Sequence, residues 1–380
     1  MSDIKPFRIE IADSQLDDLR QRLKMTRWPE RATTDDWSQG IPLSYVQEVA
    51  KYWLEEYDWR RCERALNSLP QFTTEIDGLD FHFLHIRSPH ADAQPLVLTH
   101  GWPGSILEFA KVIGPLSDPS AYGGDPADAF HVVCPTLPGF GFSGKPSKPG
   151  WGVERIGRAW GQLMARLGYD RYVAQGGDWG AVVTSCIGVS ETAHCAGIHI
   201  NMPIVSPSDA MLQNLTEFEK SCLAGGQYYW DSGSGYSKQQ STRPQTIGYG
   251  LVDSPVAQAA WIIEKFWDWT DSDGHPENVL TRDELLDNVM LYWLPGAGAS
   301  SARLYWESFN ILGQQQVEIT LPTGASIFPH EIFRSSKRWI EERYKNLVHY
   351  NVLEKGGHFA AFEQPESFVQ ELRTCFRHMR

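Results

Sequence analysis

Hydrophobic and polar positions follow a helical rhythm in the first part of the chain. Leu16, Leu19 and Leu23 recur at helical spacing, and a second helical stretch runs from Ser44 to about Leu66 with aromatic residues on one face. The surrounding sequence is polar. The pattern therefore predicts a helical N-terminal extension over residues 1–70, which we expect to wrap the rest of the molecule.

After this extension the pattern changes to that of strands. Phe72–Ile86 alternates apolar and polar residues around Asp77-Gly78, which is a strong signal for a β-hairpin. Short apolar runs then follow at 95–98, 131–134 and 172–174, separated by glycine-rich turns and helical segments. Uninterrupted apolar strands that alternate with helices indicate a mostly parallel sheet with helices on both faces.

The strand signal fades in the stretch that follows, which is rich in Gly, Ser, Trp and Tyr and reads as helices and loops. Strand and helix alternate again from Val317–Thr320 and Leu347–Val352 onwards. We therefore expect an α/β core in two parts, 71–205 and 313–380, with a helical cap over 206–312. Ligands of such sheets bind at the carboxyl ends of the strands, where a cap closes over them.

Composition narrows the classes of partner. The 380 residues are 42% hydrophobic and 21% charged, with a formal net charge of -13, and so acidic a chain repels phosphate backbones. We therefore expect no nucleic-acid partner. The six cysteines have no CxxC spacing, which indicates neither a zinc site nor a redox pair. No signal peptide and no apolar run of ~18 residues is visible, so we expect a cytoplasmic protein without a membrane span.

A candidate nucleophile lies at Asp178, within Gly176-Gly177-Asp178-Trp179-Gly180. The segment follows a predicted strand and precedes a helix, and small residues on either side permit a sharp turn that lifts the central side chain above the sheet. The backbone N–H of Trp179 would then point back at that side chain. The alternative is a glycine-rich turn whose aspartate merely caps a helix.

A second loop, His100-Gly101-Trp102-Pro103-Gly104-Ser105, follows the strand at 95–99. In this architecture the loop supplies the second donor of an oxyanion hole, which we assign to the N–H of Trp102. An ordinary turn is the alternative reading, and for His100 we prefer a role in shaping the loop.

The candidate base is His358, which follows Gly356-Gly357 just beyond the last predicted strand. The acid that orients such a base should follow the preceding strand, where Glu331 stands. Nucleophile, acid and base then occur in the order Asp178, Glu331, His358, which is the chain order of α/β-hydrolases.

A carboxylate nucleophile suits attack at a saturated carbon, which yields an ester of the enzyme itself. His358 would activate water to hydrolyse that ester, and Glu331 would hold its tautomer. Alkyl halides and epoxides both fit this scheme. An epoxide oxygen additionally needs an acid, for which phenols in the cap are suitable.

The sequence resembles the microsomal-type epoxide hydrolase family, in its soluble members, over nearly the whole chain. The motifs that carry the resemblance are Pro6-Phe7-Arg8-Ile9, Thr26-Arg27-Trp28-Pro29, HGWPGS at 100–105, LPGFGFS at 137–143, GGDWG at 176–180, Asp253-Ser254-Pro255-Val256 and GGHFAAFEQPE at 356–366. The resemblance implies the α/β-hydrolase fold and the opening of epoxides to vicinal diols without a metal or organic cofactor. It also implies that Tyr236 and Tyr305 bind the epoxide oxygen.

We expect Trp102, Trp179 and Phe359 to border the substrate, which would be a small-molecule epoxide that reacts with water; the many aromatic residues hint that it is bulky and apolar. The role of the protein would be detoxification or natural-product biosynthesis. Two alternatives stay open: a haloalkane or haloacid dehalogenase of the same fold, and a non-catalytic binding protein on a hydrolase scaffold. The sequence also leaves open a homodimer.

Overall fold

Among residues 3–313 and 317–380, the part of the chain that the structure describes, nine strands form one sheet. Their bounds are Lys5–Pro6 (β1), Gln71–Ile76 (β2), Leu79–Ile86 (β3), Gln94–Thr99 (β4), Phe130–Pro135 (β5), Tyr172–Gly176 (β6), Cys195–Ile200 (β7), Thr323–Ile327 (β8) and Leu347–Val352 (β9). Their order across the sheet in this computed structural model is β1-β2-β3-β5-β4-β6-β7-β8-β9. Neighbouring strands pair in parallel along the series β5-β4-β6-β7-β8-β9. The pairs β1-β2, β2-β3 and β3-β5 are antiparallel.

The hairpin expected around Asp77-Gly78 is present, and it joins β2 to β3. Both turn residues have positive φ, 53° at Asp77 and 77° at Gly78, which matches the right-handed twist of the two strands. Strands β6, β7 and β8 are buried along their whole length. This is the burial expected of parallel strands that are covered on both faces.

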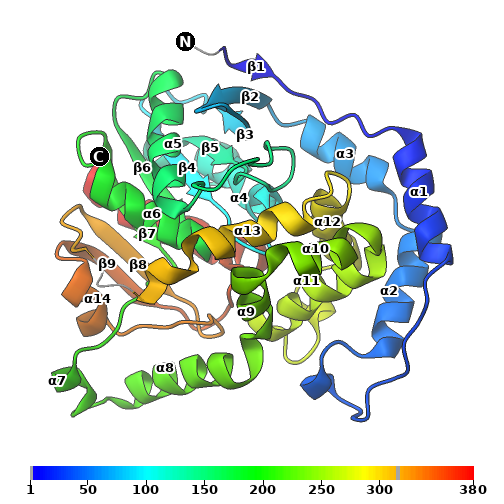
Figure 1. Ribbon diagram of the computed structural model, residues 1–380. Helices are drawn as coiled ribbons and strands as arrows, with labels where there is room; N and C mark the ends of the chain where they lie inside the picture. The colour runs from blue at the N-terminus through cyan, green and yellow to red at the C-terminus, as the bar shows by residue number, and fades with distance from the viewer. Residues whose placement is uncertain (1–2, 314–316) are drawn as a thin grey trace.

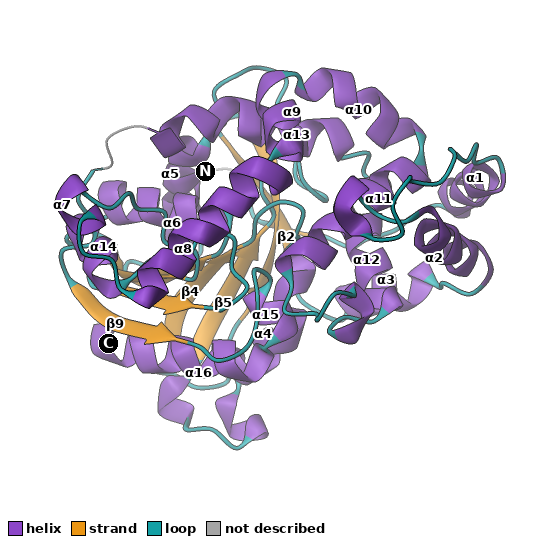
Figure 2. Ribbon diagram, turned by 90° about the horizontal axis from the view of Figure 1, so that it is seen from below, coloured by secondary structure: helices purple, strands orange, loops and turns teal. Residues whose placement is uncertain are grey.

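The helices beside the sheet are Ala110–Ser117 (α4), Val153–Arg166 (α5), Trp179–Ser190 (α6), Lys337–Arg343 (α14), Ala360–Glu363 (α15) and Pro365–Phe376 (α16). Helices α5 and α6 lie on one face of the sheet, and α4 and α16 lie on the other (Figure 2). The predicted mostly parallel sheet between two helical layers is therefore confirmed (Figure 2).

Between β7 and β8 the chain leaves the sheet and forms a group of helices (Figure 1, green to yellow). They are Asp209–Leu212 (α7), Glu217–Tyr228 (α8), Gly235–Thr242 (α9), Pro244–Asp253 (α10), Pro255–Trp269 (α11), Arg282–Trp293 (α12) and Gly298–Ser308 (α13). A π-helical turn, Tyr229–Gly233, joins α8 to the segment that leads into α9. Hereafter we call α7 to α13 the inserted helices.

The N-terminal helices are Asp13–Lys24 (α1), Leu43–Glu55 (α2) and Trp59–Asn67 (α3). They lie along the inserted helices rather than over the sheet (Figure 1, blue). Three phenols of this segment bond to carboxylates of the insertion: Tyr45 to Glu277 at 2.8 Å, Tyr52 to Asp283 at 2.9 Å and Tyr57 to Asp287 at 2.6 Å. Strand β1 meanwhile pairs with β2, so the same segment also reaches the edge of the sheet.

Two predictions of local structure were wrong. Val317–Thr320 is not a strand; only Ile319 makes an isolated bridge, to Tyr344, and the strand of the sheet is β8, a few residues later. The helical stretch predicted from Ser44 to Leu66 consists of two helices, because the helical conformation is interrupted at residues 56–58. Residues 1–2 and 314–316, which belong to the predicted extension and to the second core segment, lie outside the described residues.

Candidate active site

Asp178 stands on a sharp turn between β6 and α6. Its backbone has φ 52° and ψ −131°, and its side chain makes no bond that caps α6, which disfavours the reading of a mere helix cap. The flanking glycines are sterically required. A Cβ on Gly176 would lie 2.1 Å from the carbonyl oxygen of Gly180, and one on Gly180 would lie 1.9 Å from that of Thr99. The turn therefore holds Asp178 above the carboxyl end of the sheet in a conformation that few side chains adopt.

His358 and Glu331 approach Asp178 from the loops that follow β9 and β8, two adjacent strands that β7 separates from β6. Glu331 follows the end of β8, His358 follows β9, and their loops run side by side through a bridge between His330 and Gly357. His358 Nε2 lies 3.3 Å from Asp178 Oδ2, and His358 Nδ1 lies 2.5 Å from Glu331 Oε1. The structure thus brings the three predicted side chains together in a line, with the imidazole between the two carboxylates.

Charges and burial set the protonation of this line. Burial by itself lowers the pKa of His358, but the charge of Glu331 and the hydrogen bond and charge of Asp178 raise that pKa well above its ordinary value. Burial raises the pKa of Glu331, which the imidazole partly offsets. The N–H of Ile332 donates to Glu331 Oε1 at 2.7 Å and fixes the carboxylate. The two acidic side chains therefore both favour the protonated form of the imidazole.

The loop after β4 contributes a backbone donor. The N–H of Trp102 donates to Asp178 Oδ1 at 2.8 Å, and a Cβ on Gly101 would meet that oxygen at 2.1 Å. His100 is buried beneath the loop, where it accepts from the N–H of Leu137 at 3.3 Å and contacts the carbonyl of Gly101 at 3.0 Å. Burial lowers the pKa of His100 to about 4, so its neutral ring supports the loop.

Tyr236 and Tyr305 enter from α9 and α13 and face each other. Their hydroxyl oxygens are 3.5 Å apart, and both side chains are buried. The ring of Trp102 stacks on Tyr236 at 4.9 Å and meets Tyr305 edge-on at 5.8 Å. Trp179 in turn contacts Tyr305 at 4.9 Å. Two helices of the insertion therefore present phenols to the loops that carry the nucleophile and its backbone donor.

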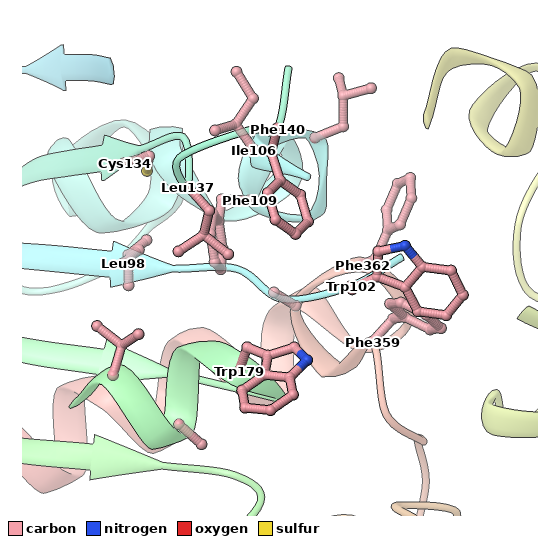
Figure 3. Packing of buried hydrophobic residues seen from close by; sticks show 14 of the residues in the cluster. Leu98, Trp102, Ile106, Phe109, Cys134, Leu137, Phe140, Trp179, Phe359 and Phe362 are labelled. Carbon is pink, nitrogen blue, oxygen red and sulfur yellow. The ribbon is translucent and has the colours of Figure 1, made fainter. Parts of the chain in front are cut away.

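Phe359 lies beside the catalytic candidates. Its ring stacks on Phe266 of α11 at 4.1 Å and meets the His358 ring at 5.0 Å. Figure 3 shows Trp102 beyond the end of the strand that carries Leu98, and Trp269 contacts both Trp102, at 6.4 Å, and Phe359, at 6.3 Å. The residues predicted to border a substrate thus come from separate loops at the carboxyl end of the sheet.

Some residues of the site have no sequence signal that we recognised. Trp269, at the end of α11, contacts His358 at 5.0 Å and Tyr236 at 5.2 Å. Tyr229, in the π-helical turn, has its hydroxyl 3.2 Å from that of Tyr236. Both come from the insertion, where nothing in the spacing distinguishes these aromatic residues from the others; only the fold brings them to the site.

Two further glutamates lie close enough to affect the charge of the site. Burial raises the pKa of Glu108 to about 8 and that of Glu363 to about 7. Glu363 accepts from the N–H of Asp271 at 2.8 Å and from the N–H of Phe359 at 3.0 Å. It therefore ties the loop of His358 to the segment that follows α11.

A large surface groove lies away from these residues. It has a volume of about 1070 Å³ and runs between residues 18–46 of the N-terminal extension and residues 253–260 at the junction of α10 and α11. None of the side chains that we describe at the candidate active site lines this groove. The geometry of the buried side chains, and not the size of a cavity, therefore locates the site.

Known proteins are similar to this chain over nearly its whole length. Residues 4–109 match the family model described as epoxide hydrolase N terminus, and residues 94–221 match the alpha/beta hydrolase fold. A protein of Stigmatella aurantiaca (strain DW4/3-1), provisionally named an epoxide hydrolase, is 54% identical over 99% of this chain and 86% of its own length. Epoxide hydrolase 1 of Sus scrofa is 36% identical over 97% of this chain and 88% of its own.

A solved structure is similar throughout. That of the Aspergillus niger epoxide hydrolase superposes with a TM-score of 0.90 at 35% identity, covering 100% of this chain and 97% of the other. Within residues 3–313 and 317–380, no helix combines the length and the apolar character needed to cross a bilayer.

Proposed function

The chain belongs to the epoxide hydrolase family and is an epoxide hydrolase, and from that premise we propose that it opens epoxides through a covalent ester on Asp178. In the first step a carboxylate oxygen of Asp178 attacks a ring carbon. The carbon–oxygen bond of the epoxide breaks, its electron pair stays on the oxygen, and that oxygen takes a proton from a tyrosine. The products are a hydroxyalkyl ester and a phenolate.

The second step is hydrolysis of that ester. Once Asp178 is an ester its negative charge is gone, and with it one of the interactions that raise the pKa of His358. The imidazolium then passes its proton to the phenolate, and the neutral ring accepts a proton from water. Hydroxide adds to the ester carbonyl carbon, the diol leaves, and the Asp178 carboxylate and the imidazolium are restored.

The single observation that carries this mechanism is the line from Asp178 through His358 to Glu331, with separations of 3.3 and 2.5 Å. We assign stabilisation of the tetrahedral oxyanion to the N–H groups of Trp102 and Trp179. The assignment of Trp102 is supported by its bond of 2.8 Å to Asp178 Oδ1, because the same atom becomes an oxygen of the ester.

An epoxide, in contrast to an alkyl halide, leaves an alkoxide that needs a proton. We therefore assign the donors to Tyr236 and Tyr305. Their hydroxyl separation of 3.5 Å supports the assignment, since one oxygen can lie within reach of both. Replacing both by Phe should abolish epoxide opening, whereas any dehalogenation would be spared. Full epoxide turnover by the double variant would contradict this assignment.

We also propose the division of the chain that goes with this mechanism: an extension over 1–70, a core over 71–205 and 313–380, and a cap over 206–312. Support comes from the inserted helices, which carry both phenols, and from the core loops, which carry the nucleophile, the base and the acid. We expect bulky apolar epoxides, such as arene-substituted ones, because the site is lined by aromatic rings.

The test of the covalent step is the source of the oxygen in the diol. Turnover of styrene oxide in water enriched in heavy oxygen is compared between a single turnover and many. If Asp178 attacks, the first diol carries ordinary oxygen from the carboxylate and later diols carry the label. Label in the first turnover would mean that water attacks directly and that Asp178 is not the nucleophile.

A further inference from the structure

Part of the insertion lies across the two loops that carry the base and the acid. This part consists of Trp269, the last residue of α11, and the two residues that follow it, Thr270 and Asp271. The carbonyl of Trp269 accepts from the N–H of His358 at 2.8 Å. A Cβ on Gly357 would lie 2.4 Å from that carbonyl oxygen and 3.0 Å from the nitrogen of Asp271, so the approach requires a residue without a side chain. Residues 269–271 are therefore in direct contact with the loop of the base.

The carboxylate of Asp271 reaches both loops at once. Its Oδ2 accepts from the N–H of Gly356, two residues before His358, at 2.9 Å. Its Oδ1 lies 3.1 Å from Nε2 of His330, the residue directly before Glu331. Each oxygen thus serves one loop, and one side chain fixes the residue that leads into the base relative to the residue that leads into the acid.

The two loops need such a support because their own backbone leaves them freedom to move. They meet at the bridge between His330 and Gly357, where the N–H of His330 donates to the carbonyl of Gly356 at 3.1 Å. A bridge of this kind allows a pivot, and Gly356 has φ 104°, in a region that glycine enters and leaves easily. The Asp271 carboxylate adds a contact to each loop beside the bridge and connects both loops to the end of α11, which restricts that pivot.

We propose that Asp271 is a positioning residue for ester hydrolysis. It holds the loop of His358 and the loop of Glu331 in the mutual placement that lets the imidazole take a proton from water. The inference rests on the proposed function. Asp271 itself exchanges no proton: the water proton goes to His358 Nε2, and the hydroxide adds to the ester carbonyl carbon.

The two steps of the proposed reaction depend on this placement to different degrees. In ester formation Asp178 attacks and a tyrosine gives the proton, so His358 exchanges no proton with the substrate. In ester hydrolysis Nε2 of His358 must reach a water at the ester carbonyl, and small displacements of a reacting group are costly. Among the described residues, the hydrogen bonds of Asp271 and its contact with His330 all go to residues that follow β8 or β9, not to Asp178 or to the phenols. Loss of Asp271 should therefore slow hydrolysis selectively.

The main variant is Asp271→Ala, which removes both contacts of the carboxylate. Ester formation is measured with enzyme in excess over styrene oxide, by acid quench and mass spectrometry of the adduct, and hydrolysis is measured from the level and decay of the same adduct. We expect hydrolysis to be about 10-fold slower than in the wild type and ester formation to stay within about 2-fold. Equal slowing of both steps would overturn the proposal and leave Asp271 a role in folding alone.

The matched control is Asp273→Asn, an exposed change two residues further along the same segment. Asp273 has φ 49°, a conformation that asparagine also tolerates, so this variant should alter neither step. Asp271→Asn keeps an oxygen for the N–H of Gly356 and places an amide group beside His330. It should recover most of the hydrolysis that Asp271→Ala loses.

The arm that reaches the acid loop has its own test in His330→Gln, a change at a side chain that is 55% exposed. Alone it should slow hydrolysis about 3-fold, less than Asp271→Ala does, because the bond to Gly356 remains. In an Asp271→Ala background it should have no further effect, since the contact is already lost. The same slowing in both backgrounds would mean that His330 acts independently of Asp271, which contradicts the proposal.

The remaining outcomes separate this inference from the proposed function. If His358→Gln accumulates the ester but Asp271→Ala hydrolyses it at the wild-type rate, the role of Asp271 is wrong and the mechanism stands. If neither the wild type nor His358→Gln forms an ester, the proposed function fails and the inference fails with it. Should Asp271→Ala not fold, His330→Gln decides: slower hydrolysis with unchanged ester formation supports the proposal, and hydrolysis at the wild-type rate contradicts it.

Discussion

At the scale of single residues, the position of the proposed nucleophile could be predicted because its unusual backbone conformation requires small neighbours. Asp178 has φ 52°, and a turn with this conformation needs the small neighbours that the sequence displays around it. His358 and Glu331 were found by their places after strands. Tyr229 and Trp269 could not be found in this way, since they reach the site through contacts across helices that have no sequence spacing in common.

One prediction at this scale concerns the histidine. His358→Gln should still form the ester, because Asp178 attacks without help from water, but hydrolysis should slow at least ~100-fold. Mass spectrometry of the intact protein after mixing with styrene oxide would then show an adduct of the substrate mass that maps to Asp178. If the variant accumulates no adduct while the wild type turns over the same substrate, the covalent scheme is contradicted.

A second prediction concerns Glu363. In Glu363→Gln the carboxamide can accept only one of the two N–H groups of Asp271 and Phe359, and the loop of His358 loses a tie to α11. We expect ester hydrolysis to slow about 10-fold through the misplaced imidazole, and the free energy of unfolding to fall by about 1–3 kcal/mol. Glu366→Gln, an exposed change on the same segment, should do neither. Unchanged hydrolysis in the Glu363 variant would limit the residue to a role in stability.

At the scale of elements, strand β8 shows why apolar patterns can mislead. Its sequence, TGASI, is poor in large side chains, and the richer Val317–Thr320 was predicted instead. The reason is the close packing of α16 and β7 around this strand. A Cβ on Gly324 would lie 2.2 Å from Cys375 Sγ of α16 and 3.0 Å from the ring of His199 of β7. A central strand packed this closely needs small residues, which reduces the signal by which a strand is recognised.

The contact between α8 and α14 yields a prediction with a pH dependence. Glu219 accepts from Arg338 and from the hydroxyls of Ser336 and Thr216. These bonds, that from Arg338 foremost, hold the pKa of Glu219 well below its ordinary value of 4.5. A lowered folded-state pKa gives stability that is complete above the unfolded pKa and is lost as the pH falls through the folded value.

Glu219→Gln should therefore lower the free energy of unfolding by about 1–3 kcal/mol at pH 7, and the difference from the wild type should shrink only below about pH 4.5. Thermal unfolding of both proteins across this range measures the effect. Glu217→Gln, which changes an exposed carboxylate on the same helix turn, is the matched control. A difference that persists unchanged into strong acid would mean that the charge of Glu219 is not what stabilises the contact.

At the scale of the whole molecule, the class of the fold could be predicted from the alternation of strands and helices, whereas the packing of the extension could not. Residues 1–70 were expected to wrap the molecule, yet which surface they cover depends on pairs such as Tyr57 with Asp287. Such pairs join residues 230 positions apart, and no local pattern identifies the partner.

Asp287 offers a test of this packing. Its carboxylate is buried and accepts from Tyr57 at 2.6 Å and from Arg61 at 2.8 Å. Tyr57→Phe removes one donor from a buried carboxylate, so we expect a loss of about 1–3 kcal/mol in the free energy of unfolding. Limited proteolysis of the extension should also become faster. Tyr249→Phe, on an exposed surface, should change neither; resistance of the Tyr57 variant equal to that of the wild type would mean that the extension is held by other contacts.

The hydrogen bonds between the extension and the inserted helices also determine when folding can be completed during synthesis of the chain. Tyr45, Tyr52 and Tyr57 leave the ribosome 232, 231 and 230 residues before the carboxylates that they bond. At roughly 5–20 residues per second, this is a wait of roughly 10–50 s. Throughout that interval the surfaces of α1, α2 and α3 that pack against α11 and α12 have no partner. This segment is thus completed late, and the nascent chain must keep it soluble until the inserted helices have emerged.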